Sequence, residues 1–175
     1  MDKGKIEIVK GLAKDYNQYD KSLLQSAIKQ VTGCNDSQAA EWGHSHCNLL
    51  SWYFGLFAEQ KIMMPYAMYF ESLLKNKCCN EAGNMLLTKD NIAPLCFGFE
   101  YPVDYLYDFD NVLNPSNLDP ESFYQLRIIN SSHYMCSWVE NSKLMIADTH
   151  DRGYGVPAIG AARIDKEHFS WMMKI

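Results

Sequence analysis

The sequence lacks the long apolar and long basic segments that identify membrane proteins and nucleic-acid-binding proteins. Its most apolar stretch, residues 48–58, falls short of the ~20 residues that a membrane-spanning helix needs. No run of basic residues exceeds two, and 16 Lys and Arg against 21 Asp and Glu give a net charge of −5. Because binding through phosphate contacts requires a basic surface, we expect neither a nucleic-acid partner nor a membrane partner.

The first residues also lack the pattern of an export signal, since the charged segment 1–5 is followed by no apolar segment of signal-peptide length. We therefore expect a cytoplasmic protein whose cysteines are reduced thiols. Free cysteines are mostly small buried residues, so an accessible one at the start of a helix is a candidate for chemistry. The six cysteines are Cys34, Cys47, Cys78, Cys79, Cys96 and Cys136.

Internal repeats and low-complexity tracts are absent too, and 175 residues match the size of one domain. Hydrophobic residues make up 47% of the chain and charged residues 21%, unlike the composition of disordered proteins. A chain of this length buries roughly 70% of its unfolded surface, which is enough for a core that needs no metal. We therefore expect a single domain over residues 1–175.

The first half of the sequence has the periodicity of helices. Residues 20–31 place apolar side chains on one face at helical spacing. Residues 45–61 predict a second helix without a polar face, which is typical of a helix in the middle of a domain. Further helices are expected at residues 65–77 and 88–96.

The second half alternates with the period of two that β-strands show. Strands are expected at residues 123–129, 132–139 and 143–148, and another near 169–175. Between the two halves, residues 98–120 are rich in Tyr, Asp, Asn and Pro and predict a long ordered loop that borders a site. Helices followed by an antiparallel sheet indicate the α+β class, since βαβ units would alternate the two types.

Cys47 stands in the first turn of the most apolar predicted helix, where unpaired N–H groups and the helix dipole stabilise a thiolate. Such a nucleophile needs a base, and His133 is the histidine that opens a strand. If Glu140 and Asn141 form a two-residue turn, His133 lies directly opposite Asp148 in the hairpin. The carboxylate can then orient the imidazole, which gives a triad of Cys47, His133 and Asp148.

A later turn changes this register without separating the pair. With Asn141 and Ser142 in the turn, Asp148 lies opposite Met135 and diagonal to His133, on the same face of the sheet. A shift by a single residue would instead send Asp148 to the other face. The predicted pair of His133 and Asp148 therefore survives the two-residue change of register and is lost after a shift of one residue.

Three short segments share residues with one known family. They are His46-Cys47-Asn48-Leu49-Leu50, Ser132-His133-Tyr134-Met135 and Ile146-Ala147-Asp148, with Gly153 and Gly155 just beyond the last. In these segments the chain resembles the papain-like cysteine peptidase superfamily, most nearly its compact bacterial and phage branches of NlpC-type and bacteriocin-processing-type peptidases. The resemblance implies a buried nucleophile helix packed on a C-terminal antiparallel sheet. It also implies a Cys-His-Asp triad that acts on an amide, isopeptide or thioester carbonyl.

The family usually places a glutamine shortly before the nucleophile as an oxyanion donor. Gln38 lies nine residues upstream of Cys47, while Trp42 and His46 are nearer. The backbone N–H of Cys47 is a further donor by geometry. Tyr105, in the aromatic loop, can stack on a peptide. The expected partner is a peptide or a peptidoglycan-like substrate, no cofactor is expected, and the oligomeric state is left open.

Two other functions are compatible with the same residues. A papain-like domain can bind peptides without catalysis, with Asp148 only a hydrogen-bond partner of a sheet histidine. His44, His46 and Cys47 also place three metal ligands within four residues, which a zinc-binding module can use. No second pair of ligands with zinc-site spacing follows, so a thiol hydrolase or acyltransferase is the leading hypothesis and no metal is expected.

Overall fold

The computed structural model describes residues 1–18, 23–86, 97–98, 105–106, 108–112, 114–129, 133–149, 159–162 and 164–175. The helices of the first half are α1 (Lys3–Asp15), α2 (Leu23–Thr32), α3 (Asp36–Gly43), α4 (Cys47–Ala58) and α5 (Tyr66–Lys75). Three short elements follow: β1 (Tyr105–Leu106), α7 (Phe109–Val112) and the 3-10 helix η1 (Pro115–Asn117). The longer strands are β2 (Phe123–Ile128), β3 (His133–Glu140), β4 (Lys143–Ala147), β5 (Ile159–Ala161) and β6 (Phe169–Lys174). The chain is therefore α+β, as its two periods predict.

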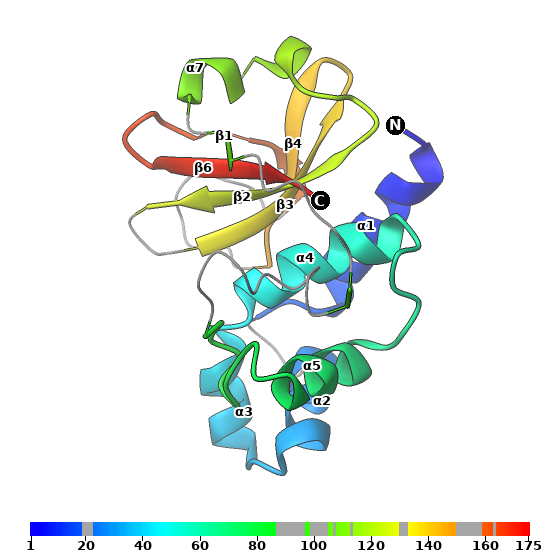
Figure 1. Ribbon diagram of the computed structural model, residues 1–175, viewed down its shortest axis with the longest axis vertical. Helices are drawn as coiled ribbons and strands as arrows, with labels where there is room; N and C mark the ends of the chain where they lie inside the picture. Colours follow the sequence, from blue (N-terminus) through cyan, green and yellow to red (C-terminus); the bar gives the residue numbers. More distant parts are fainter. Residues whose placement is uncertain are drawn as a thin grey trace.

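The six strands form one antiparallel sheet in the order β1-β6-β2-β3-β4-β5. In Figure 1 the sheet lies in the upper half of the molecule and α4 runs beneath it, with α2, α3 and α5 farther below. α4 begins at the end of the sheet where β3 starts (Figure 1). This arrangement brings the first residue of α4 toward the first residue of β3.

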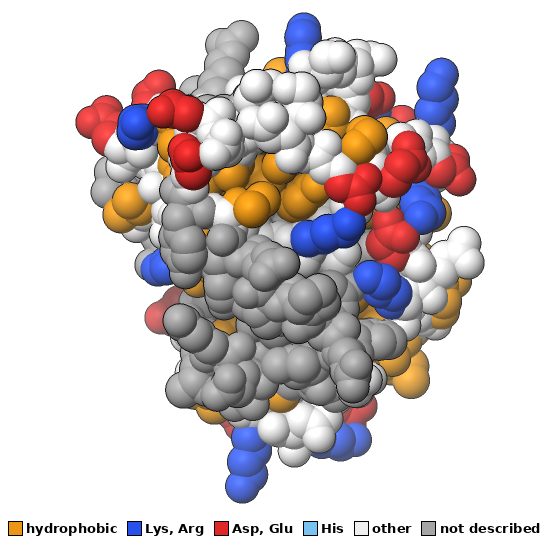
Figure 2. Space-filling model, turned by 45° about the horizontal axis from the view of Figure 1, so that its top comes forward, with side chains coloured by type: hydrophobic (Ala, Val, Ile, Leu, Met, Phe, Trp, Pro, Cys, Tyr) orange, Lys and Arg blue, Asp and Glu red, His pale blue; other side chains and the backbone are white. Residues whose placement is uncertain are grey.

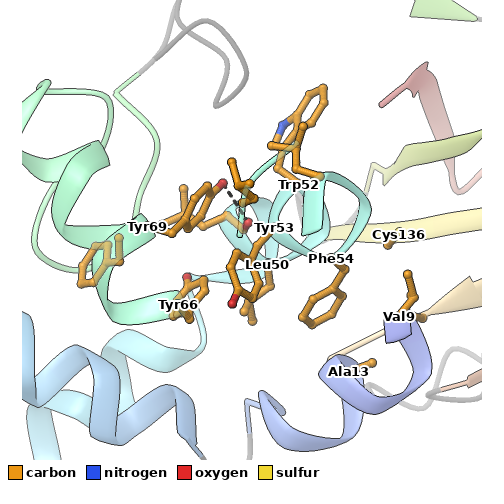
Figure 3. Close-up of a cluster of buried hydrophobic side chains, with 14 of the residues drawn as sticks. Val9, Ala13, Leu50, Trp52, Tyr53, Phe54, Tyr66, Tyr69 and Cys136 are labelled. Atoms are coloured by element: carbon orange, nitrogen blue, oxygen red, sulfur yellow. Dashed lines mark hydrogen bonds between the residues drawn. The ribbon is translucent and has the colours of Figure 1, made fainter. Parts of the chain in front are cut away.

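α4 is the centre of the core. Ten of its twelve residues are buried, because it packs on the sheet, on α1 and on α5 at the same time. Figure 3 shows its side chains between Tyr66 and Tyr69 of α5, Val9 and Ala13 of α1, and Cys136 of β3. Each large apolar side chain buried here contributes about 1.5–3 kcal/mol relative to an exposed one. The predicted absence of a polar face on this helix is confirmed.

The opposite face of the sheet is covered by α7 and its neighbours. Val112 joins a second apolar cluster on that face, and Phe109 packs edge-on against Phe169 of β6, with ring centroids 5.6 Å apart. On the side of the molecule that Figure 2 brings forward, hydrophobic side chains lie between acidic and basic ones. Residues 98–120 are therefore wrongly predicted as irregular, at least where β1, α7 and η1 form.

Besides α7 and η1, four elements were not predicted from the sequence, and each has a local reason. α1 buries only Ile6, Val9 and Ala13, which is a narrow stripe, and α3 is an eight-residue helix that buries only Ala39 and Gly43. β1 and β5 have two and three residues, too few to show a period. The predicted helix at 88–96 lies outside the described residues. Within the described ranges, no helix combines the length and the hydropathy needed to cross a membrane.

Cysteine chemistry departs from the prediction at one position. Cys34, Cys47, Cys79 and Cys136 are free thiols, whereas Cys78 is disulfide-bonded. The expectation that every cysteine is reduced is therefore wrong for Cys78. Disulfides are uncommon in the cytosol, so this bond does not favour the cytoplasmic location, which stays a prediction from the first residues of the sequence.

Candidate active site

The three residues of the predicted triad meet at one end of the sheet. Cys47 is the first residue of α4, His133 is the first residue of β3, and Asp148 directly follows β4. His133 Nε2 lies 2.5 Å from Asp148 Oδ1, and Cys47 is close enough to His133 to raise the pKa of its imidazole. All three are nearly buried, with 8% of Cys47, 1% of His133 and 5% of Asp148 exposed. The structure therefore brings the three side chains together, with His133 hydrogen-bonded to Asp148 and Cys47 beside the ring.

The register that joins them is the second of the two predicted ones. Glu140 pairs with Lys143, so Asn141 and Ser142 form the turn, with φ of 51° and 57°. Positive φ at both central positions defines a type I′ turn, whose twist matches that of the strands it connects. The predicted turn at Glu140-Asn141, with Asp148 directly opposite, is wrong. Continued by one residue, the observed register sets Asp148 diagonal to His133, and the pair still forms.

The bond to Asp148 decides which imidazole nitrogen serves the thiol. An ionised carboxylate can only accept, so Nε2 carries a proton and donates it to Asp148 Oδ1. The nitrogen that remains for Cys47 is Nδ1. Asp148 thus holds the ring in the orientation and tautomer that a general base for Cys47 requires.

His133 is held in its charged form by these neighbours. Burial alone lowers the pKa of His133, but the hydrogen bond to Asp148, the hydrogen bond to Cys47 and the negative charge of both partners raise it to about 9. A buried imidazolium between two acidic groups is the electrostatic arrangement of a thiolate-imidazolium pair.

The start of α4 leaves donors available beside the Cys47 thiol. The N-cap residue, His46, makes no side-chain hydrogen bond to the first turn of the helix. The first N–H groups of a helix have no intrahelical acceptor, so the backbone N–H of Cys47 can bind a negatively charged oxygen. The oxyanion donor that the geometry supports is therefore the main chain.

Gln125 on β2 fixes this helix end to the sheet. Its side-chain Nε2 donates to Asn48 Oδ1 at 3.0 Å and to Ser51 Oγ at 2.7 Å, and the residue is only 1% exposed. Buried hydrogen bonds of this kind are costly to break, because each leaves a desolvated group unpaired. Sequence reasoning missed Gln125, although a polar residue between Phe123 and Arg127 at an inward position of a strand is a usable signal.

Gln18 connects the two halves of the site from a distant part of the sequence. Its side-chain Nε2 donates to the carbonyls of Gly43 and His44, at 2.9 and 3.1 Å, in the segment that leads to Cys47. Its backbone N–H donates to the carbonyl of Thr149, next to Asp148, at 3.0 Å. No sequence pattern points to Gln18, because its partners are remote along the chain.

His46 does not face the site, so its predicted role in binding a substrate or oxyanion is wrong. It is 0% exposed, and its Nδ1 lies 2.7 Å from the Tyr66 hydroxyl. Phe70 packs edge-on against the ring at 4.7 Å between centroids, and the backbone of Gly83 covers its other edge. Burial lowers the pKa of His46 to about 3, so this ring is a neutral core residue.

The other predicted substrate-binding residues receive no support from the geometry. Gln38 is an exposed residue in the first turn of α3, where its side chain accepts from the backbone N–H of Asn35 in a capping box, so the oxyanion role is wrong. Trp42 is half-buried against the helical core. Tyr105 lies in β1 at the edge of the sheet, paired with Met173 of β6.

The zinc-binding alternative also finds no support. The ring of His46 is enclosed by the core, and across the described ranges the ligand atoms of His44, His46 and Cys47 do not converge. The convergent group found there is Asp165, Glu167 and His168, on the surface. A hollow of about 630 Å³ lies between the start of α1, η1 and the β3–β4 turn, and no triad residue lines it.

Comparison with protein families, curated proteins and solved structures finds nothing that matches this chain.

Proposed function

We propose that this protein is a papain-like thiol hydrolase or acyltransferase with Cys47 as nucleophile. The observation that carries the proposal is the buried cluster of Cys47, His133 and Asp148 at the start of the central helix, in which Asp148 holds the His133 ring beside Cys47. Three residues from three elements must coincide for this cluster to form. A purely structural sheet histidine would need only its carboxylate partner, and the thiol would be superfluous.

In the proposed reaction, the Cys47 thiolate attacks the carbonyl carbon of an amide or thioester. Negative charge then develops on the carbonyl oxygen, next to the backbone N–H of Cys47. His133 gives its Nδ1 proton to the leaving amine or thiol, which departs as the acyl-enzyme thioester forms. His133 next takes a proton from water, or from an acceptor amine, which attacks the thioester and releases Cys47.

Peptides are the substrate class that this architecture favours. The triad lies between a helix start and a sheet end, and the sequence motifs that form it resemble those of the papain-like superfamily. A peptide, an isopeptide or a peptidoglycan-like stem peptide supplies the carbonyl that the nucleophile requires. Asp148 orients the base and needs no contact with the substrate.

Selective alkylation tests the nucleophile. The folded protein is treated with iodoacetamide at pH 6, and the modification of each cysteine is followed by mass spectrometry. We expect Cys47 to react faster than Cys34, although Cys34 is the more exposed free thiol. The reason is that only a thiolate reacts, and an unperturbed thiol is about 99% protonated at this pH.

Turnover separates the enzyme from a silent binding domain. p-Nitrophenyl acetate is a generic acyl donor, and its hydrolysis should continue beyond one equivalent in wild type and stop in Cys47→Ala. A fast-reacting Cys47 without turnover would favour the peptide-binding alternative. Equal alkylation of Cys47 and Cys34 would overturn the proposed nucleophile.

A further inference from the structure

In the described part of the sheet, Arg127 is a cation on the face that packs against α4. Gln125 and Arg127 are two apart on β2, so both side chains project from the face on which Gln125 contacts Asn48 and Ser51 of α4. A step of two residues along a strand advances about 6.6 Å. Arg127 therefore lies about one such step beyond the first turn of α4.

The direction in which α4 runs places Gln125 and Arg127 of β2 toward the N-terminus of this helix. Gly55, late in the helix, lies against Ile175, whose N–H pairs with Phe123 at the start of β2. α4 thus runs against β2, and its first residue points toward the end of β2 where Arg127 lies. The neighbouring pair in this register, Ile128 and His133, projects from the opposite face, so Arg127 is adjacent to the site through the start of α4 and not through His133.

Arg127 has an aromatic residue opposite it on each of the two neighbouring strands. Arg127 pairs with Tyr134 of β3 on one side and with Trp171 of β6 on the other. Its guanidinium carbon lies 5.7 Å from the centre of the Tyr134 ring, and the Tyr134 and Trp171 rings meet edge-on at 5.9 Å. The Tyr134 ring holds the guanidinium by a cation–π contact, and Arg127 as a whole residue is partly exposed.

The charge of Arg127 is not neutralised by the described part of the protein. No ion pair to Arg127 is present there, and its Nε is buried without a hydrogen-bond partner among those residues. Lysines on the same sheet do have acidic partners, such as Lys174 with Asp119 at 2.6 Å. In a chain of net charge −5, a half-buried arginine without a carboxylate is an exception.

We infer that Arg127 is a specificity-determining residue that binds a carboxylate of the substrate. Arginine binds carboxylates through two parallel N–H donors, and its preference for this planar group exceeds that of lysine. The inference rests on the proposed function, and it specifies the substrate class as peptide-like acyl donors that carry a negative charge close to the reacting carbonyl.

Two alkylating reagents that differ only in charge test the inference. Iodoacetate carries a carboxylate and iodoacetamide is neutral, and both transfer a carbon to the Cys47 sulfur with loss of iodide. The measured quantity is the ratio of their rates at Cys47, with Cys34 as internal reference in the same sample. We expect Arg127→Gln to lower this ratio about fivefold or more, and Arg127→Lys to lower it less.

The matched control is Lys143→Gln, which removes the same charge from the exposed start of β4, at the other end of the hairpin. It should leave the ratio at the wild-type value. An unchanged ratio in Arg127→Gln, with iodoacetamide still reacting quickly, would overturn the role of Arg127 and leave the nucleophile intact. If Cys47 reacts with neither reagent, the proposed function fails and this inference fails with it.

Competition in the wild-type protein decides the question even if the Arg127 variants do not fold. Acetyl-alanyl-alanine, its C-terminal amide and acetyl-glutamyl-alanine amide are compared as protectants of Cys47 against iodoacetamide. Protection by the first alone indicates a C-terminal carboxylate, and protection by the third indicates an acidic side chain. Equal protection by all three would overturn the inference.

Discussion

Two buried histidines, His46 and His133, lie at opposite sides of the start of α4 and have opposite chemistry. Burial lowers the pKa of His46 to about 3, because its surroundings are Tyr66, Phe70 and the backbone of Gly83. Burial also lowers the pKa of His133, but its hydrogen bonds and charge interactions with Asp148 and Cys47 raise it to about 9. The partners, and not the extent of burial, decide which ring is charged.

The two histidines therefore differ in role: His46 supports the start of α4 structurally, and His133 is the ring proposed to act on Cys47. A neutral ring that fills space can support the helix start but cannot stabilise a thiolate. A charged ring beside a thiol can do so, and it remains in place because Asp148 accepts its other N–H. If the two environments differ in this way, substitutions and pH changes should affect His46 and His133 differently.

The largest effect is expected at Gly83, which covers His46. A Cβ at this position would lie 2.3 Å from the His46 ring, and the backbone φ of +77° adds strain for any L side chain. We expect Gly83→Ala to lower the free energy of unfolding by roughly 3–5 kcal/mol, measured by urea denaturation. Gly33→Ala is the matched control, because Gly33 has a φ of +71° and no atom within 4 Å of an added Cβ. Equal losses in both variants would contradict the tight contact.

On the chemical side, removing the imidazole should cost reactivity more than stability. We expect His133→Gln to slow the alkylation of Cys47 by iodoacetamide at pH 6 about 100-fold, which corresponds to about 3 kcal/mol. Circular dichroism checks that the variant is folded. His46→Asn serves as the comparison, and its effect on the Cys47 rate should be small. A similar loss of rate in both variants would mean that the two rings are not distinct.

Acid should destabilise the protein through His46. Because its folded pKa lies below the ordinary value of 6.5, the unfolded chain binds a proton that the folded chain excludes. The stability is complete above pH 6.5 and is lost progressively as the pH falls toward 3. Between pH 7 and 4.5, wild type should lose about 2–3 kcal/mol more than His46→Asn in urea unfolding. Parallel losses would show that His46 is protonated in the folded state.

Base should act through His133, with the opposite sign and a smaller effect. A folded pKa raised to about 9 contributes stability that is complete below pH 6.5 and is lost as the pH rises through 9. We expect wild type to exceed Asp148→Asn by about 2 kcal/mol at pH 6.5, because the charged hydrogen bond is intact there. By pH 9.5 this difference should shrink. NMR titration of the His133 ring gives the pKa directly, and a value near 6.5 would contradict the proposed pair.

The triad was accessible to sequence reasoning because each member lies at the end of an element with a strong local pattern. Cys47 opens the most apolar helix, His133 opens an alternating strand, and Asp148 ends the next one. The role of His46 was not accessible. Tyr66, Phe70 and Gly83 enclose its ring from positions 20 to 37 residues away, and no period links them to it.

Three other polar residues differ in how far the sequence reveals them: Gln18, Gln125 and Arg127. Gln125 and Arg127 are polar residues at inward positions of an alternating strand, so the pattern of β2 marks them as unusual even though it does not name their partners. Gln18 carries no such mark, because it joins Gly43 to Thr149 across more than a hundred residues. The local sequence pattern shows that a polar residue is unusual at its position, and only its tertiary contacts show why it is there.

By itself the sequence determined the α+β order, the central position of α4 and the element ends that carry the proposed triad, because hydrophobic periods and helix starts depend on near neighbours. Tertiary structure decided the register, since Asn141 and Ser142 were chosen over Glu140 and Asn141 by the twist of the paired strands. It also decided which of two neighbouring histidines is charged. That choice depends on whether a carboxylate or an aromatic ring from a remote segment reaches the imidazole, and such long-range contacts leave no period in the sequence.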